Sequence, residues 1–200
     1  ARAIVMPNLT PPVTTVSRAV EYLDRILAAV DGTDFEPLMT LYLTDNTTAD
    51  EIIAARKSCF IKGVKLYPAG ATTNSDAGVT DIRRCDDAIG ALQETGIPLL
   101  VHGESGGFVL DREKEFLDVY RSLARGFPDL HIIMEHITTA EAVQLLDEFD
   151  NLSATVTLHH LLITLDDVIG DLLRPDLFCK PVAKTPEDRS ALREAVFSGH

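Results

Sequence analysis

The stretch Gly63-Val64-Lys65-Leu66-Tyr67-Pro68 places a lysine near the end of a short apolar run. An apolar run of this length predicts a strand that is covered on both faces, as in a parallel sheet. Burial of an unpaired ammonium group costs on the order of several kcal/mol. Lys65 is therefore either a side chain that extends along the surface to solvent or an amine kept for chemistry.

Two histidines close apolar runs further along the chain, His102 after Pro98-Leu99-Leu100-Val101 and His136 after Ile132-Ile133-Met134-Glu135. Either histidine alone is more often a hydrogen-bonded core residue. The carboxyl ends of parallel strands meet at one edge of a sheet, however, so Lys65, His102 and His136 together indicate a metal site. A desolvated lysine amine is nucleophilic and can add carbon dioxide, giving a carbamate that binds cations as a carboxylate does. Imidazole and carboxylate oxygens suit zinc.

Strand and helix patterns alternate along the chain. Strands are expected at 3–7, 38–43, 63–67, 97–102, 131–136 and 152–158. Helical spacing of apolar residues is found over 16–30, 49–58, 81–95 and 111–125, and further helices begin after Thr139 and at Thr185. This alternation predicts an α/β fold with a parallel sheet, and the absence of a linker predicts a single domain over 1–200.

Two architectures fit this alternation, an open doubly wound sheet and a (β/α)8 TIM barrel. An open sheet is expected to carry a glycine-rich turn after its first strand, but Met6-Pro7-Asn8-Leu9-Thr10-Pro11-Pro12 contains no glycine. Polar residues close nearly every strand instead, which is typical of barrels. Six strands do not close an eight-stranded barrel, so either the sheet is open or the chain lacks the first and last barrel strands.

Charge and composition narrow the class of protein. The chain has 18 basic and 31 acidic residues, a net charge of -13, and no basic patch, so nucleic acid is not an expected partner. No apolar run approaches the ~20 residues that cross a bilayer, and no secretory signal opens the chain. Three scattered cysteines, Cys59, Cys85 and Cys179, fit reduced thiols. We therefore expect a cytoplasmic protein without a membrane partner.

Five segments carry a resemblance to a known family: Arg2-Ala3-Ile4-Val5-Met6-Pro7-Asn8-Leu9, Lys65-Leu66-Tyr67-Pro68-Ala69-Gly70-Ala71-Thr72-Thr73-Asn74-Ser75, Leu99-Leu100-Val101-His102-Gly103-Glu104, Glu135-His136-Ile137-Thr138-Thr139 and Phe178-Cys179-Lys180-Pro181-Val182-Ala183-Lys184. Together they resemble bacterial dihydroorotases of the short, single-domain type, in the amidohydrolase superfamily. The resemblance implies a TIM-barrel enzyme that uses two zinc ions to cyclise N-carbamoyl-L-aspartate reversibly to L-dihydroorotate. It implies that Lys65 is N6-carboxylated and bridges the two ions, and that His102 and His136 bind the second.

Asn8 and the loop Ala71-Thr72-Thr73-Asn74-Ser75 each allow two interpretations. By itself Asn8 is as consistent with a helix cap as with a ligand contact, and the loop is either simply exposed or a lid. The resemblance implies that Asn8 contacts the substrate carboxylate and that Thr72 and Thr73 lie on a mobile loop that closes over the substrate. His159 and His160 are expected to be structural, and the charged run 111–115 is expected to be a solvated helix face.

The chain lacks residues that the family uses for metal binding and catalysis. The family's His-x-His pair with its arginine, and the aspartate that acts as the general base, are not found in the 200 residues. The chain is therefore expected to be a central portion with about six of eight strands, marginally stable and inactive by itself. A small molecule is the expected partner, and a homodimer is one possible assembly. Two alternatives stay open: a hydantoinase-like cyclic-amide hydrolase, and a non-catalytic barrel that serves as a structural subunit.

Overall fold

The computed structural model describes residues 1–198 and contains one six-stranded sheet. Its strands are β1 (Arg2–Val5), β2 (Glu36–Tyr42), β3 (Ile61–Leu66), β4 (Leu99–Val101), β5 (Ile132–Met134) and β6 (Leu152–Ala154), and their order in the sheet is their order in the chain. The pairs β1–β2, β2–β3 and β3–β4 are parallel. A doubly wound sheet reverses its strand order at a switch point, whereas this one does not. The fold is thus part of a (β/α)8 barrel.

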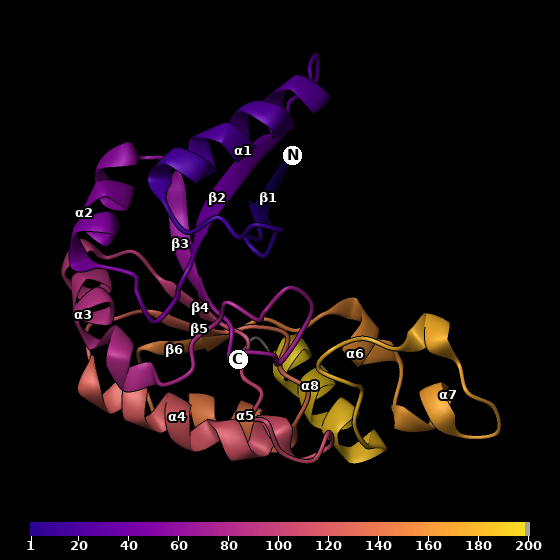
Figure 1. The fold of residues 1–200 in the computed structure, drawn as a ribbon. Coiled ribbons are helices and arrows are strands. Elements are labelled where there is room, and N and C mark those ends of the chain that lie inside the picture. Colours follow the sequence, from indigo (N-terminus) through magenta and orange to yellow (C-terminus); the bar gives the residue numbers. More distant parts are fainter. Residues whose placement is uncertain (199–200) are drawn as a thin grey trace. The chain divides into compact units, whose positions relative to one another are not determined.

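Helices follow the strands in the alternation that the sequence predicted (Figure 1). They are α1 (Val16–Ala29), α2 (Ala49–Ser58), α3 (Asp86–Thr95), α4 (Arg112–Gly126), α5 (Ala140–Leu146), α6 (Leu158–Leu162), α7 (Leu165–Ile169) and α8 (Pro186–Ser198), with the 3-10 turns η1 (Ile82–Cys85) and η2 (Pro175–Leu177). Threonine side chains fix several helix starts because their hydroxyl oxygens accept from backbone N–H groups of the first turn. Thr15, Thr48, Thr139 and Thr157 do so for α1, α2, α5 and α6.

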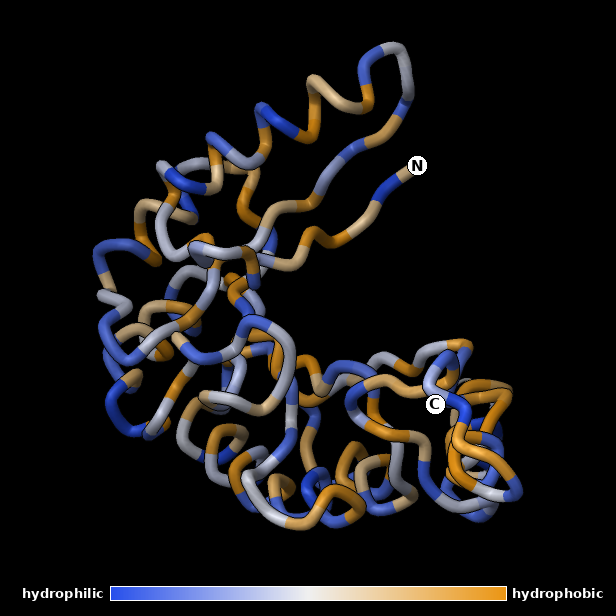
Figure 2. The backbone as a smooth tube through the Cα atoms, turned by 45° about the vertical axis from the view of Figure 1, so that its right-hand side comes forward, coloured by the Kyte–Doolittle hydropathy of each residue, from blue (hydrophilic) through white to orange (hydrophobic). Residues whose placement is uncertain are grey.

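The chain folds into two compact units. The first unit comprises Ala1–Val101 and Phe127–Ile132, and it contains β1 to β4 with their helices. Its core consists of apolar side chains that are almost fully buried: Met39, Leu41, Leu43, Ile52, Ala55, Val64, Leu66, Ile89, Leu92 and Leu99. Along α1, hydrophobic and hydrophilic residues alternate with the helical turn (Figure 2).

The second unit comprises residues 102–126 and the chain from residue 133 onward. Its core is built largely from α4, whose Phe116 and Tyr120 rings pack edge to face with centroids 5.1 Å apart. Further buried side chains come from other elements of the unit: Met134, Ala142, Leu145, Val168, Val182 and Leu192. Hydrogen bonds from Thr155 N to Met134 O and from Ile137 N to Thr155 O join the ends of β5 and β6.

The sixth strand is shorter than predicted. It ends at Ala154, and His159 and His160 lie in α6 and not at a strand end. The apolar run continues past Ala154 in sequence, but Thr157 caps a helix by accepting from His160 N at 3.3 Å. A local side-chain hydrogen bond therefore outweighs the strand propensity of Thr155-Val156-Thr157.

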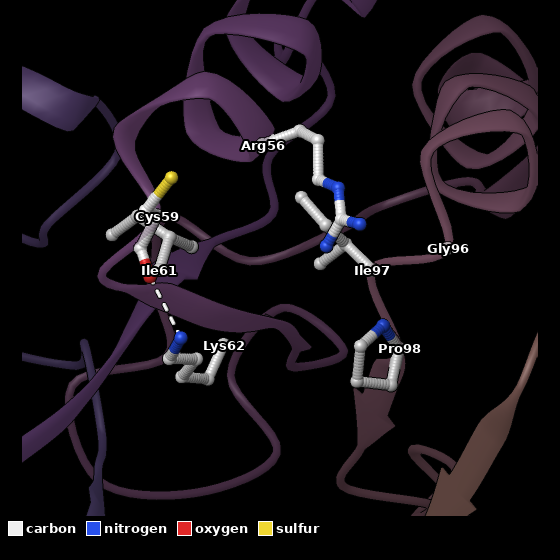
Figure 3. A pocket seen from close by; sticks show the side chains of 7 residues that line it. All are labelled: Arg56, Cys59, Ile61, Lys62, Gly96, Ile97 and Pro98. Carbon is white, nitrogen blue, oxygen red and sulfur yellow. Dashed lines mark hydrogen bonds between the residues drawn. The ribbon is translucent and has the colours of Figure 1, made fainter.

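A pocket of about 350 Å³ lies at the amino ends of β3 and β4 (Figure 3). It is lined by Arg56, Cys59, Ile61, Lys62 and residues 96–98, and Lys62 Nζ donates to Cys59 O at 2.7 Å. Barrel enzymes place their chemistry at the carboxyl ends of the strands, so this pocket lies at the other end from the expected site.

Among residues 1–198, every helix is too short or too polar to cross a bilayer.

Candidate functional site

Lys65 is buried near the carboxyl end of β3. Its side chain is 1% exposed, and its backbone pairs with Tyr42 on one side and Leu100 on the other. The ammonium lies over the Tyr67 ring, with Nζ 5.1 Å from the ring centroid. A side chain so placed does not extend to solvent, so the surface interpretation is wrong. Burial of an amine at a strand end is what carbamate chemistry requires.

Asn8 is hydrogen-bonded to the loop that follows β3. Its side-chain Nδ2 donates to Thr73 O at 3.0 Å, and Asn74 Nδ2 donates back to Asn8 O at 2.9 Å. Burial raises the pKa of Tyr42 to about 12, and the charge of Asp76 adds to the rise. The neutral Tyr42 hydroxyl therefore donates to Asn74 O, at 3.3 Å. Asn8 and Tyr42 thus hold residues 73–74 of the loop.

The loop itself closes on a buried serine. Ser75 Oγ accepts from Thr72 N at 2.9 Å and donates to Thr72 O at 2.7 Å, which makes a tight turn over residues 72–75. Asn74 supports this turn with a left-handed φ of 52°, which asparagine tolerates better than most residues. Thr73 is exposed and Thr72 half-buried, so both lie where a ligand can reach them.

In the second unit, His102 and His136 lie side by side. Their ring centroids are 4.9 Å apart and the rings meet edge to face. His102 is buried, and its Nε2 lies 2.8 Å from Oε2 of Glu104, which is also buried. Because a carboxylate only accepts, Nε2 carries a proton. Carboxylates orient metal-binding histidines in this way.

The backbone of His136 adopts an unusual conformation, with φ at 47°. Its N–H donates to Thr155 Oγ1 at 2.8 Å, which ties the residue to the chain after β6. A left-handed conformation costs a non-glycine residue on the order of 1 kcal/mol or more, and such strain concentrates at functional sites.

The histidine pair suits a divalent metal ion. Two imidazoles bound to one tetrahedral ion at about 2.0–2.1 Å place their ring centres about 5 Å apart, and the observed separation is 4.9 Å. Within residues 1–198, no group of three His, Cys, Asp or Glu side chains is arranged to hold a metal ion. Among the described residues, His, Cys, Asp and Glu side chains therefore provide no third ligand next to His102 and His136. A carbamate on Lys65 would be a ligand outside these four residue types.

Glu113 corrects the prediction for the charged run 111–115. Its carboxylate is 3% exposed and accepts hydrogen bonds from both the N–H and the hydroxyl of Thr138 and Thr139. The run is not simply a solvated face, because one of its acids turns inward. Sequence reasoning also gave no role to Glu104, although its place two residues after His102 put a carboxylate within reach of the imidazole.

His160 is a structural histidine, as the sequence predicted. Its Nε2 lies 2.9 Å from Pro181 O, which only accepts, so Nε2 is the donor and Nδ1 accepts from the Thr157 hydroxyl at 2.9 Å. Cys179 Sγ lies 3.6 Å from the same Nε2. Burial lowers the pKa of His160 and raises the pKa of Cys179, and both directions oppose a thiolate–imidazolium pair.

Acidification is expected to destabilise the protein partly through His160. Burial lowers the pKa of this imidazole, and the Pro181 hydrogen bond opposes the shift only in part. The unfolded chain, with a histidine pKa of about 6.5, therefore binds the proton first as the pH falls, so stability decreases below about pH 6.5. The charged and titratable groups near His160 include His159, Lys184, Glu104 and Cys179.

Urea unfolding of the full-length protein between about pH 7.5 and about pH 5.5 measures this contribution. His160→Gln is expected to have a smaller loss of unfolding free energy over this range than the wild type. His131→Gln, which replaces an exposed histidine, is the control. Equal pH dependence in the wild type and His160→Gln would contradict the assignment.

Comparisons with known proteins relate the chain to one family of enzymes. It is 56% identical to the dihydroorotase of Cupriavidus metallidurans, over all of the chain and 60% of that protein. The crystal structure of Campylobacter jejuni dihydroorotase matches with a TM-score of 0.95 and 49% identity, over all of the chain and 59% of that structure. The Saccharomyces cerevisiae dihydroorotase in complex with 5-fluoroorotic acid matches with a TM-score of 0.91 and 39% identity, again over 59% of that structure. No family model matches the chain.

An L-hydantoinase from Arthrobacter aurescens shares the fold, with a TM-score of 0.79 over 99% of this chain and 48% of its own. Its identity is only 19%, so the likeness shows the fold alone. The dihydroorotases match at two to three times that identity. In sequence and in fold, the whole of this chain is therefore similar to dihydroorotases, of whose length it spans about 60%.

Proposed function

We propose that the protein to which these 200 residues belong is a metal-dependent dihydroorotase. It would interconvert N-carbamoyl-L-aspartate and L-dihydroorotate, a step of pyrimidine synthesis. The observation that carries this proposal is the 56% identity to a dihydroorotase over the entire chain, together with the buried lysine at the end of β3. The adjacent imidazoles of His102 and His136 support it, because their separation fits one metal ion.

Each of three side chains would have a part in metal binding. Lys65, as N6-carboxylysine, would supply carbamate oxygens, and His102 and His136 would supply imidazole nitrogens. The chemistry of these ligands favours zinc, with two ions in the intact site. Bound zinc lowers the pKa of water and polarises a carbonyl group, as hydrolysis of a cyclic amide requires. Glu104 would hold His102 in the tautomer that presents Nδ1.

Asn8, Thr72 and Thr73 would bind the substrate. The Asn8 amide has two N–H groups, one of which donates to Thr73 O, and the second would donate to a substrate carboxylate. The hydroxyls of Thr72 and Thr73 would donate to the same ligand from the loop. The general base would lie outside this chain, as would the His-x-His ligands of the other metal ion, the one that His102 and His136 do not bind. We further propose a cytoplasmic enzyme with a single barrel domain, with a homodimer as one assembly.

The proposal is tested by assaying the full-length protein with and without added zinc. Hydrolysis of dihydroorotate is expected to exceed hydrolysis of hydantoin by at least two orders of magnitude, since a site built for the carboxylate leaves its donors unpaired with a substrate that lacks it. Comparable turnover of hydantoin would favour the hydantoinase-like alternative. Absence of both activities and of bound metal would favour the non-catalytic barrel.

Replacing Thr72 and Thr73 together by alanine is expected to lower kcat/KM for dihydroorotate about 10- to 100-fold while the zinc content stays unchanged. Each hydrogen bond to a charged ligand contributes up to about 3 kcal/mol of binding free energy. Water that replaces the lost hydroxyl restores part of this free energy. The backbone bonds of Thr72 to Ser75 do not need the threonine hydroxyl, so the turn should persist. Wild-type kinetics in the double variant would refute a role for the two hydroxyls.

A further inference from the structure

Glu113 is a buried carboxylate with an unusually complete set of partners. Oε1 accepts from Thr138 N, Thr139 N and the Thr139 hydroxyl at 2.9, 2.9 and 2.7 Å, and Oε2 accepts from Thr138 N and the Thr138 hydroxyl at 2.9 and 2.6 Å. A buried negative charge is costly unless hydrogen bonds compensate it. Here four different donors do so, and all of them come from two consecutive residues.

These two residues begin two positions after the metal-ligand candidate His136. The N–H of His136 donates to Thr155 Oγ1, and the N–H of Ile137 donates to Thr155 O. Glu113 then binds Thr138 and Thr139, the next two residues. The left-handed φ of His136 therefore lies at the start of a segment that is anchored at four successive residues, and a conformation of this kind persists only where its surroundings enforce it.

Helix α4, which carries Glu113, also contacts the segment after His102. Tyr120 lies against Gly103, so closely that a Cβ at that position would overlap its ring. The Ser105 hydroxyl donates to Glu115 Oε2, also on α4. One helix thus contacts the chain that follows each of the two histidines, with polar contacts on both sides.

We infer that Glu113 is a positioning residue, which fixes the backbone after His136 and thereby holds the two imidazoles at the separation that a metal ion requires. Glutamine cannot replace it, because the amide nitrogen is a donor and would face the N–H and hydroxyl donors of Thr138 or Thr139. The inference rests on the proposed function for the identity of the bound metal, but the positioning itself can be measured without metal.

Metal affinity of the full-length protein is the first test. Zn²⁺ dissociation constants are measured by competition with a chelator for the wild type, Glu113→Gln and Glu148→Gln. Glu148 pairs with Arg121 at the surface, so its variant is a matched control. Glu113→Gln is expected to bind Zn²⁺ about 10- to 100-fold more weakly, as is usual when an outer partner of a metal ligand is changed. Affinities equal to the wild type in folded Glu113→Gln would overturn the inference.

A second pair of variants covers the case in which Glu113→Gln fails to fold. Thr138→Ser keeps the hydroxyl that donates to Glu113, and Thr138→Val removes it while it keeps the branched shape. Hydrogen exchange of the His136 amide, measured without metal, is expected to be about tenfold faster in Thr138→Val than in Thr138→Ser. Equal exchange in the two variants would overturn the inference. If the two variants differ in this way but the wild-type protein has neither zinc nor dihydroorotase activity, the proposed function alone would be refuted.

Discussion

Lys65→Met in the full-length protein is expected to abolish most dihydroorotate hydrolysis and to lower the zinc content, while the protein stays folded. Changing an outer partner of a metal ligand costs about 10- to 100-fold, so loss of a ligand itself should cost more than about 100-fold. Methionine fills nearly the same space without a charge, and replacing a buried charge by an apolar group of similar volume is often neutral or stabilising. The thermal midpoint is therefore expected to stay equal or to rise.

Lys62→Met is the control, because Lys62 lies in the same strand and is exposed. Its activity and zinc content are expected to match the wild type. The carbamate can be observed directly by ¹³C NMR after exchange with labelled bicarbonate, as a signal present in the wild type and in Lys62→Met but not in Lys65→Met. Full activity of Lys65→Met, or a carbamate signal that persists in it, would show that the metal ligand is another residue.

Gly103→Ala is expected to destabilise the protein by about 1–3 kcal/mol, the usual cost of forcing an extra methyl group into a packed core. A Cβ at residue 103 would overlap the Tyr120 hydroxyl, with two ring carbons at 2.6 and 2.7 Å. Tyr120 cannot withdraw easily, because its ring is fully buried and packs edge to face on Phe116. Residue 103 follows His102, so we also expect weaker zinc binding.

Gly106→Ala provides the matched comparison, since a Cβ there meets no atom within 4 Å. Its free energy of unfolding is expected to lie within about 0.5 kcal/mol of the wild type. Chemical denaturation measures both variants, and zinc competition measures the effect on the site. A Gly103→Ala variant as stable as Gly106→Ala would mean that Tyr120 and its neighbours adjust at little cost.

Local signals in the sequence predicted the fold well where they were strong. The Thr48-Ala49-Asp50-Glu51 cap and the apolar spacing after it predicted a helix over 49–58, which is the range of α2. The sixth strand was predicted over 152–158 but ends at Ala154, because Thr157 caps a helix. An apolar run alone does not show whether a helix cap or β propensity prevails. The choice between open sheet and barrel depends on strand order, which is a long-range property.

The candidate site likewise includes residues that the sequence predicted and residues that it did not. Lys65 stands out in sequence because a charged residue ends an apolar strand, and the structure buries it. Glu113 lies in the first turn of a helix beside Arg112 and Lys114, where acidic residues are ordinarily solvated. Its partners are Thr138 and Thr139, about 25 residues away, and nothing in the local pattern distinguishes an inward acid from an outward one.

If His136 binds metal as proposed, its left-handed backbone sets stability against function at a single position. Glycine reaches that conformation without steric cost, and asparagine reaches it more easily than histidine. A thermostability screen that was blind to metal would therefore favour replacing this residue, and the winning variants would have lost an imidazole from the site. Engineers who stabilise this protein should hold position 136 fixed and seek their gains elsewhere.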